Sequence, residues 1–191
     1  MTDGGRLMTA RSLAVLLFVF CIPALSSATT IVPADLGALS HDAIAIVRGR
    51  VAAVDGRWTD DRRTIETIVT LDVDEYLKGD LGRAVQFRVP GGLLGRFRSI
   101  VVGAPRFAVD DRVIVFLGSR GPMIPFIVGF SQGIYRVVRD GSRDTWRVTP
   151  PLMPSAAIDS PVRIVRGDPA RVPLALDEFE ARVRALVGSS K

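Results

Sequence analysis

Apolar and polar residues alternate along several short segments of the chain, which is the pattern of half-buried β-strands. The clearest segment covers residues 64–77, where Val69 and Leu71 alternate with polar neighbours. A second segment covers residues 43–54, and its alternation shifts at Gly49, as it does at a β-bulge or where another backbone approaches closely. The pattern therefore predicts two long strands in the first half of the chain.

Five shorter strands follow from the same pattern, separated by turn residues. We expect one turn at residues 55–56 (Asp-Gly) and another at residues 140–141 (Asp-Gly). Residues 112–117 are almost wholly apolar, which indicates a strand that is covered on both faces. The five shorter strands are predicted at residues 84–89, 112–117, 126–130, 133–138 and 145–148. Short strands joined by turns rather than by helices favour a mainly β fold, a small antiparallel barrel that is closed or partly closed.

Two helices and one irregular segment flank the predicted strands. Residues 33–41 can form about two turns of helix ahead of the first strand. Six prolines punctuate residues 149–173, so this stretch should be extended and without regular structure. An apolar stripe predicts a helix within residues 174–188, opened by a capping box of Asp177 and Glu180. We expect this stripe to pack on the barrel.

The first 28 residues have the features of a secretory signal peptide. Arg6 and Arg11 precede an apolar run over residues 13–22, which is shorter than the roughly 20 apolar residues of a transmembrane helix. We predict cleavage near Ala28 and export to the periplasm or the extracellular space, with no stable membrane anchor afterwards. The alternatives are lipidation at Cys21 and a retained N-terminal anchor. The predicted organisation is a signal peptide (1–28), a β-barrel domain (29–148), a proline-rich extended segment (149–173) and a C-terminal helix (174–188).

Composition narrows the possible classes of protein. Of the 191 residues, 48% are hydrophobic and 24% are charged, which excludes a disordered, collagen-like or coiled-coil protein. Cys21 is the only cysteine, so a disulfide framework, a cysteine metal site and a thiol redox pair are excluded. His41 is the only histidine, which excludes a multi-histidine metal centre. The formal net charge is +5 and nearly all basic residues are arginine. GC-rich coding explains this excess better than binding to a polyanion, because basic and acidic residues are mixed along the chain.

Several short motifs occur in order along the predicted barrel. They are residues 42–51 (Asp-Ala-Ile-Ala-Ile-Val-Arg-Gly-Arg-Val), 77–80 (Leu-Lys-Gly-Asp), 89–92 (Val-Pro-Gly-Gly), 103–107 (Gly-Ala-Pro-Arg-Phe), 113–117 (Val-Ile-Val-Phe-Leu) and 129–137 (Gly-Phe-Ser-Gln-Gly-Ile-Tyr-Arg-Val). Together they resemble a group of exported bacterial proteins built on one small β-domain. The resemblance covers about residues 35–138 and carries no activity with it.

The predicted N-terminal helix, the opening strand and the Leu-Lys-Gly turn are also similar to the OB-like barrel of netrin-type domains and tissue inhibitors of metalloproteinases. This second similarity implies an OB-like barrel. It does not imply inhibition, because those inhibitors act through an N-terminal cysteine, and the predicted mature chain has no cysteine.

No motif predicts a catalytic residue, a metal site or a cofactor. Ser40, His41 and Asp42 are consecutive, so they cannot converge on one reacting atom as a hydrolase triad does, and we expect a surface or capping role for His41. Asp72 and Asp74 project from one face of a predicted strand, where paired carboxylates could bind Ca²⁺ or act in acid–base catalysis. We expect arginines on a neighbouring strand to neutralise these carboxylates instead.

The segment over residues 91–106 is the strongest candidate for a binding surface, because it joins apolar side chains to arginines between glycines. Arginine and aromatic residues are favoured at the centres of interfaces, and loops on a rigid barrel frequently carry binding. The candidate binding residues are Arg96, Phe97, Arg98 and Arg106. The alternative is that residues 100–102 are a further strand and that Leu93, Leu94 and Phe97 close one end of the barrel.

Three functions follow as hypotheses. The first, which we favour because the catalytic inventory is empty, is an exported, non-catalytic module that binds an envelope or extracellular protein. The second is an enzyme whose carboxylates, such as Asp72, Asp74 and Asp111, meet in one cleft. The third is an OB-like barrel that binds a polyanion such as a charged polysaccharide. Export and the scarcity of aromatic stacking platforms argue against a nucleic-acid partner.

Overall fold

The computed structural model describes residues 34–141, 144–151 and 172–189. The predicted signal peptide and most of the predicted proline-rich segment lie outside these residues. In chain order the elements are α2 (Leu36–Asp42), β1 (Ala45–Trp58), β2 (Ile65–Lys78), β3 (Ala84–Pro90), β4 (Gly92–Leu94), β5 (Phe97–Ser99), β6 (Arg112–Gly118), β7 (Phe126–Ile127), a short 3₁₀ helix η1 (Phe130–Gly133), β8 (Ile134–Asp140), β9 (Thr145–Thr149), β10 (Leu174–Ala175) and α3 (Leu176–Gly188).

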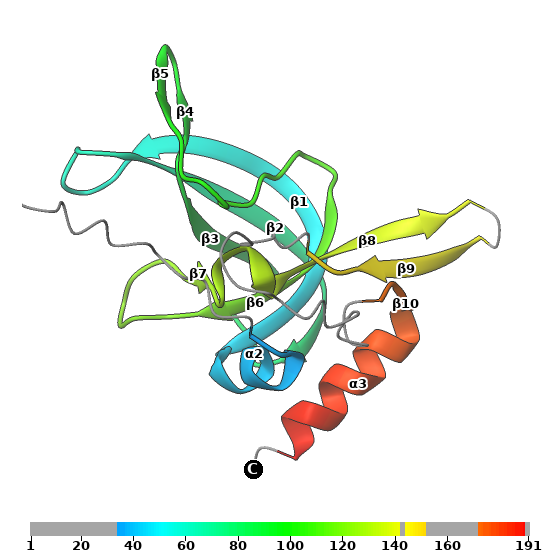
Figure 1. Cartoon of the computed structure of the whole chain (residues 1–191). Helices are drawn as coiled ribbons and strands as arrows, with labels where there is room; N and C mark the ends of the chain where they lie inside the picture. The colour runs from blue at the N-terminus through cyan, green and yellow to red at the C-terminus, as the bar shows by residue number, and fades with distance from the viewer. Residues whose placement is uncertain (1–33, 142–143, 152–171, 190–191) are drawn as a thin grey trace, which may run out of the picture. The chain divides into compact units, whose positions relative to one another are not determined.

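Five strands form a partly closed ring, in the order β1-β2-β3-β7-β6 and back to β1 (Figure 1). β1 pairs antiparallel with both β2 and β6, and the second of these pairings returns the ring to its first strand. The narrowest seam is the parallel pairing of β3 with β7, where Arg88 lies opposite Phe126 and its backbone N–H donates to Pro125 O over 2.8 Å. This ring confirms the predicted mainly β fold, a partly closed and largely antiparallel barrel with a short N-terminal and a C-terminal helix.

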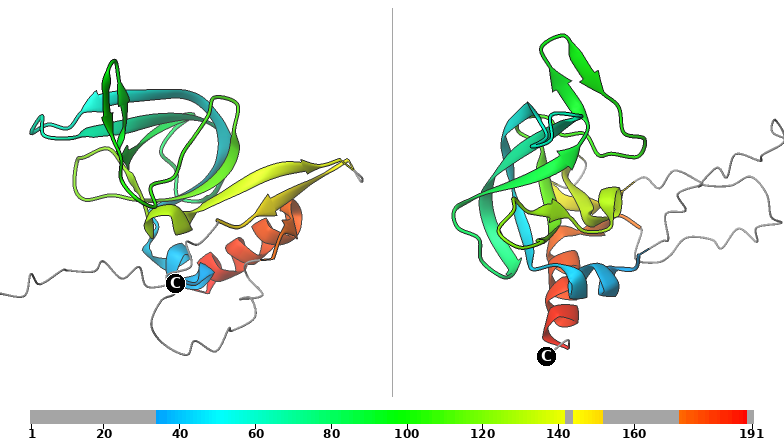
Figure 2. Two further views of the ribbon diagram at one scale, coloured as in Figure 1. Left: turned by 45° about the horizontal axis from the view of Figure 1, so that its top comes forward. Right: turned by 90° about the vertical axis from the view of Figure 1, so that its left-hand side faces the viewer.

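The ring continues into a hairpin that extends beyond it (Figures 1 and 2). β8 pairs with β6, β9 pairs with β8, and the short strand β10 pairs with β9. The hairpin closes where Asp140 lies opposite Thr145, as the Asp-Gly pair predicted. The strand predicted over residues 126–130 is shorter than expected. Its chain turns at Gly129 and Phe130, whose φ angles of 65° and 61° are left-handed, and enters η1.

β1 is longer than the sequence indicated, because residues 55–56 form no turn. β1 pairs with β2 as far as Trp58 opposite Ile65, and the chain reverses between Thr59 and Thr64, which are joined by a 2.9 Å backbone hydrogen bond. The irregularity predicted at Gly49 is confirmed. The register with β2 shifts there, and a Cβ on Gly49 would collide with the carbonyl oxygen of Asp72.

Two apolar clusters fill the fold, one inside the ring and one between the ring and the helices. β6 contributes to both, as its uninterrupted apolar sequence predicted. Val113 and Val115 face the interior of the ring, while Ile114 and Phe116 face α2 and α3, and all four are fully buried. Because the outer face of β6 is apolar as well, the helices pack against it on the outside of the ring.

The two helices lie at the end of the ring opposite the β4–β5 hairpin (Figures 1 and 2). Asp35 caps α2 by accepting a 2.6 Å hydrogen bond from Ala38 N. α3 packs through Phe179, whose ring centroid is 4.6 Å from that of Tyr135, so the predicted packing of its apolar stripe is confirmed. The predicted capping box is wrong. Leu174 and Ala175 pair with β9 as a strand, so α3 begins after Ala175 without a side-chain cap.

Neither of the helices that the structure describes has the length and the apolar character needed to cross a membrane.

Candidate binding surface

The segment predicted as a loop is an ordered hairpin that projects from one end of the ring (Figure 1). β4 and β5 form a separate two-stranded sheet in which Leu93 lies opposite Arg98, and the turn falls at Gly95, whose φ is 56°. The alternative interpretation placed a further strand at residues 100–102. The structure has this strand at residues 97–99 instead.

Close backbone contacts anchor this hairpin on the ring. β4 crosses β1 at Gly56, where a Cβ would collide with the carbonyl oxygen of Leu93. Gly92 has a φ of 150° and lies against Thr67 of β2, whose hydroxyl donates a 2.7 Å hydrogen bond to Gly91 O. Glycine permits the approach of one backbone to another at Gly56, and at Gly92 it permits the positive φ and the close contact with the Thr67 side chain. The direction in which the hairpin projects is therefore fixed by the sequence.

The anchored hairpin presents large apolar side chains to solvent. Leu93 is 64% exposed and Phe97 is 47% exposed, so these residues do not close the end of the barrel. The ring centroid of Phe97 lies 5.6 Å from that of Trp58, at the end of β1. We call this group the hairpin surface. Its members are the exposed residues Trp58, Leu93, Phe97, Ile100, Val101 and Val102. Large apolar side chains exposed together on one projecting segment are typical of an interaction site.

Three exposed arginines belong to the same segment as most of the hairpin surface. Arg96 lies at the hairpin turn, with its guanidinium carbon 5.1 Å from the centre of the Phe97 ring. Arg98 belongs to β5, and Arg106 lies on the chain that leads back to the ring. Within the residues that the structure describes, no carboxylate lies at ion-pair distance from any of the three.

The other arginines of the fold mostly meet a carboxylate within 4 Å. These are Arg48, Arg50, Arg57, Arg112, Arg136, Arg139, Arg147 and Arg184. Arg96, Arg98 and Arg106 differ from these eight arginines in having no such partner among the described residues, so their charges are free to contribute to binding.

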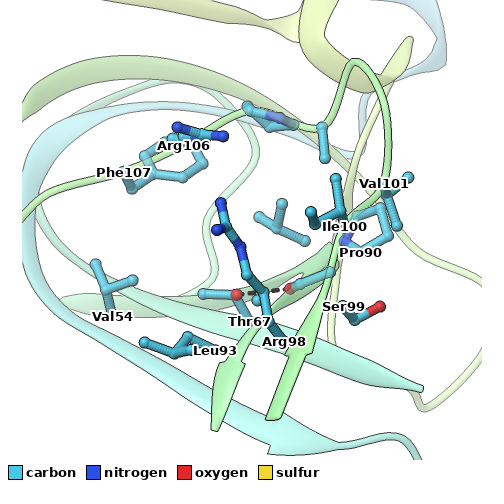
Figure 3. Close-up of a pocket in the computed structure, with 15 residues that line it drawn as sticks. Val54, Thr67, Pro90, Leu93, Arg98, Ser99, Ile100, Val101, Arg106 and Phe107 are labelled. Atoms are coloured by element: carbon cyan, nitrogen blue, oxygen red, sulfur yellow. Dashed lines mark hydrogen bonds between the residues drawn. The ribbon is translucent and has the colours of Figure 1, made fainter. Parts of the chain in front are cut away.

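A cleft of about 390 Å³ opens between the hairpin and the chain over residues 100–107 (Figure 3). Val54, Val89 and Phe107 contribute apolar wall, and Thr67 and Gly91 lie at the base of the hairpin. None of the fifteen lining residues is acidic. We call this space the hairpin cleft. Its volume falls in the lower part of the range of about 300–1,000 Å³ found for ligand sites.

Two of the predicted binding residues meet in the hairpin cleft and two do not. Arg98 extends across the cleft toward Arg106 (Figure 3), and both residues line it. Arg96 and Phe97 lie outside the cleft lining, at the projecting part of the hairpin. Sequence reasoning did not place Trp58 here. Its position follows from the continuation of β1 through Gly56, which the sequence had assigned to a turn.

The candidate catalytic carboxylates each lie beside an arginine, as expected for Asp72 and Asp74. Asp74 Oδ2 lies 3.2 Å from Arg112 Nη1, and Asp111 Oδ2 lies 2.7 Å from Arg136 Nη1. Asp72 Oδ2 lies 3.7 Å from Arg50 Nη2. Among the described residues, no group of three or more histidine, cysteine, aspartate or glutamate side chains could hold a metal ion.

His41 lies on the surface in the last turn of α2. Its Nδ1 is 3.0 Å from Asp42 Oδ1, and its side chain is 74% exposed. Its backbone oxygen and that of Ser40 accept hydrogen bonds from Lys78 Nζ, over 3.0 and 2.7 Å. Lys78 therefore satisfies carbonyl groups at the C-terminal end of this helix.

A second charged cluster fastens α3 to the strands. Arg48 on β1 donates a 2.8 Å hydrogen bond to Glu75, and its Nε lies 2.7 Å from Glu180 Oε1 on α3. Arg184 on α3 pairs with Glu75 and Glu180. The hydrogen bond from Arg48 lowers the pKa of the Glu75 carboxyl below its ordinary value; partial burial opposes this, and the charge of Arg184 adds to it. Because all four groups are paired, we assign this cluster a structural role.

No family model, no curated protein and no solved structure matches this chain.

Proposed function

We propose that the chain is an exported, non-catalytic binding module that docks on an envelope or extracellular protein through the hairpin surface. The predicted signal peptide supports the export part of this proposal. The binding part rests on the residues described above.

One observation carries the proposal: exposed apolar side chains stand on a hairpin that the fold holds in place. Gly56 and Gly92 permit contacts that fix β4 on the ring, while Leu93 and Phe97 remain exposed to solvent. Exposing these side chains to water opposes stability, because burial of apolar surface contributes about 25 cal/mol per Å². A partner that covers these side chains buries their apolar surface, and this burial favours formation of the complex.

The arginines around the hairpin favour a protein partner over a polyanion. Polyanion sites depend mainly on several cations that neutralise the charges of the polymer. Here Leu93, Phe97 and Ile100 lie among Arg96, Arg98 and Arg106. Aromatic residues and arginine are the types enriched at the centres of protein interfaces.

The pairing of the carboxylates supports binding rather than catalysis. Asp72, Asp74 and Asp111 lie within 4 Å of arginine nitrogens. A general acid or base must lie within hydrogen-bond reach of the group whose proton it transfers, whereas these three carboxylates lie against arginine side chains of the fold itself.

The experiment that tests the proposal is recovery of binding proteins with the purified, tagged protein from the extracellular and envelope fractions of the producing cells. We expect a specific partner whose recovery falls strongly with the variant L93S/F97S. The matched control is I44S/V138S, which replaces two exposed apolar side chains outside the hairpin surface. Each is 44% exposed, and their replacement should leave recovery unchanged. Equal recovery with both variants would contradict the proposal.

A further inference from the structure

The hairpin cleft has the features of a site for one anionic group with an apolar neighbourhood. Its two cations, Arg98 and Arg106, come from two different segments and lie on the same space (Figure 3). The cleft has no acidic lining residue, and neither arginine has a carboxylate partner among the described residues. Two like charges on one cleft repel each other until an anion lies between them.

Both arginines stand on backbone that is fixed from outside the cleft. Arg98 lies on β5, opposite Leu93 of the anchored strand β4. The carbonyl oxygen of Arg106 accepts a hydrogen bond from Arg136, whose guanidinium also pairs with Asp111 over 2.7 Å. The next residue along, Phe107, packs edge-on against the buried Phe87, with ring centroids 5.4 Å apart. The cleft is therefore formed in the absence of a ligand, which lowers the entropy cost of binding.

The chemistry of the lining selects the anion. A guanidinium presents paired N–H donors that match a carboxylate, and two guanidiniums can hold both of its oxygens. Val54, Val89 and Phe107 supply apolar wall beside these donors. Sulfate and phosphate groups carry a hydration shell on every side, and this wall could not replace it. A carboxylate attached to an apolar chain matches both parts of the lining.

Resting on the proposed function, we infer that the hairpin cleft binds an acidic side chain of the partner protein, presented on a short segment whose neighbouring residues are apolar. The carboxylate lies between Arg98 and Arg106. The flanking apolar side chains cover Leu93 and Ile100, which border the cleft and are 64% and 69% exposed. Specificity comes from the carboxylate, and most of the buried area comes from its neighbours.

Selection from a displayed library of random octapeptides tests this inference on the purified protein. We expect the selected peptides to share one glutamate or aspartate flanked by apolar residues. The dissociation constant of the best peptide and of its Glu→Gln analogue is then measured by fluorescence anisotropy. Removing a charge-assisted pair should weaken binding roughly ten- to a hundredfold, whether the peptide carboxylate or the two arginines are removed.

The protein variants for this measurement are R98Q/R106Q and R83Q/R182Q. The first should lose the distinction between the acidic peptide and its Gln analogue. The second makes the same change of charge at two exposed arginines away from the cleft and should bind like the unchanged protein. R98K/R106K should recover part of the affinity, because lysine keeps the charge but not the paired donors.

Several results would overturn the inference: no selected peptides, selected peptides without a carboxylate, or full binding by R98Q/R106Q. Binding to vesicles of an anionic phospholipid that depends on Arg98 and Arg106, without peptide selection, would also overturn it and assign the surface to a membrane. A natural partner that is lost with L93S/F97S but kept with R98Q/R106Q would reject the inference alone. A partner kept with both variants would reject the proposed function as well.

Discussion

Replacing Gly56 with alanine tests how the β4–β5 hairpin is held on the ring. The added Cβ would collide with the carbonyl oxygen of Leu93, so β4 must move away from β1. Such overpacking costs about 1–3 kcal/mol. Alanine gives back about 0.4–1 kcal/mol by restricting the unfolded chain, so we expect a net loss of about 1–2 kcal/mol. For a chain of this length that corresponds to a fall in the thermal midpoint of about 3–6 °C.

The displacement should also be visible at Trp58, whose ring is 5.6 Å from that of Phe97. In a W146F background, which leaves Trp58 as the only tryptophan, the emission of G56A should move to longer wavelength as the contact opens. Gly188→Ala is the matched control, because nothing lies within 4 Å of a Cβ at that position. An unchanged midpoint and an unchanged emission for G56A would refute the account of the anchored hairpin.

Three further predictions concern the core, the charged cluster and the N-terminus. Phe116→Ala removes a fully buried ring between β6 and the helices, and should cost about 3–5 kcal/mol in denaturant unfolding; a loss below 1 kcal/mol would contradict this packing. Because Arg48 lowers the pKa of folded Glu75, its contribution to stability is present above the ordinary pKa of a glutamate, about 4.3, and is lost as the pH falls through the lower folded value. The stability difference between the unchanged protein and Glu75→Gln should therefore shrink between about pH 5 and pH 3, whereas a constant difference would exclude this linkage. The intact mass of the exported protein should correspond to a chain that starts near Thr29, and a retained 1–28 segment would exclude cleavage.

The sequence predicted correctly those strands whose own pattern of apolar and polar residues shows which faces are buried. β6 is apolar at every interior position, and the structure buries it on both faces. β2 alternates, and its predicted inward residues Val69 and Leu71 are fully buried. In both cases the hydrophobic pattern alone determines which side of the strand faces the core.

The predictions of a turn at Gly56 and a capping box at Glu180 were wrong because each residue contacts a part of the chain that is distant in sequence. Gly56 follows an aspartate and has the local sequence of a turn, but it is needed where the Leu93 carbonyl crosses β1. Glu180 has the spacing of a capping box, but it pairs with Arg48 on β1. Neither contact is visible in the neighbouring sequence, because each joins residues far apart in the chain.

The sequence predicted which residue types the candidate site contains, but not how they are arranged in space. Arginine and aromatic residues in one segment indicated an interface, and the structure gathers them at one end of the ring. The division between the projecting part, with Arg96 and Phe97, and the cleft, with Arg98 and Arg106, could not be predicted. It depends on the register of β4 with β5, in which alternate residues take opposite faces.

Site-specific photo-crosslinking from position 97 tests the central claim most directly. A photoreactive phenylalanine analogue replaces Phe97 in one protein and Val138 in another; both positions are exposed, and the second lies on the β8–β9 hairpin. After illumination with the envelope and extracellular fractions, we expect one defined protein adduct from position 97 and none from position 138. The same adduct from both positions, or an adduct from position 138 alone, would contradict the assignment of the hairpin surface as the binding site.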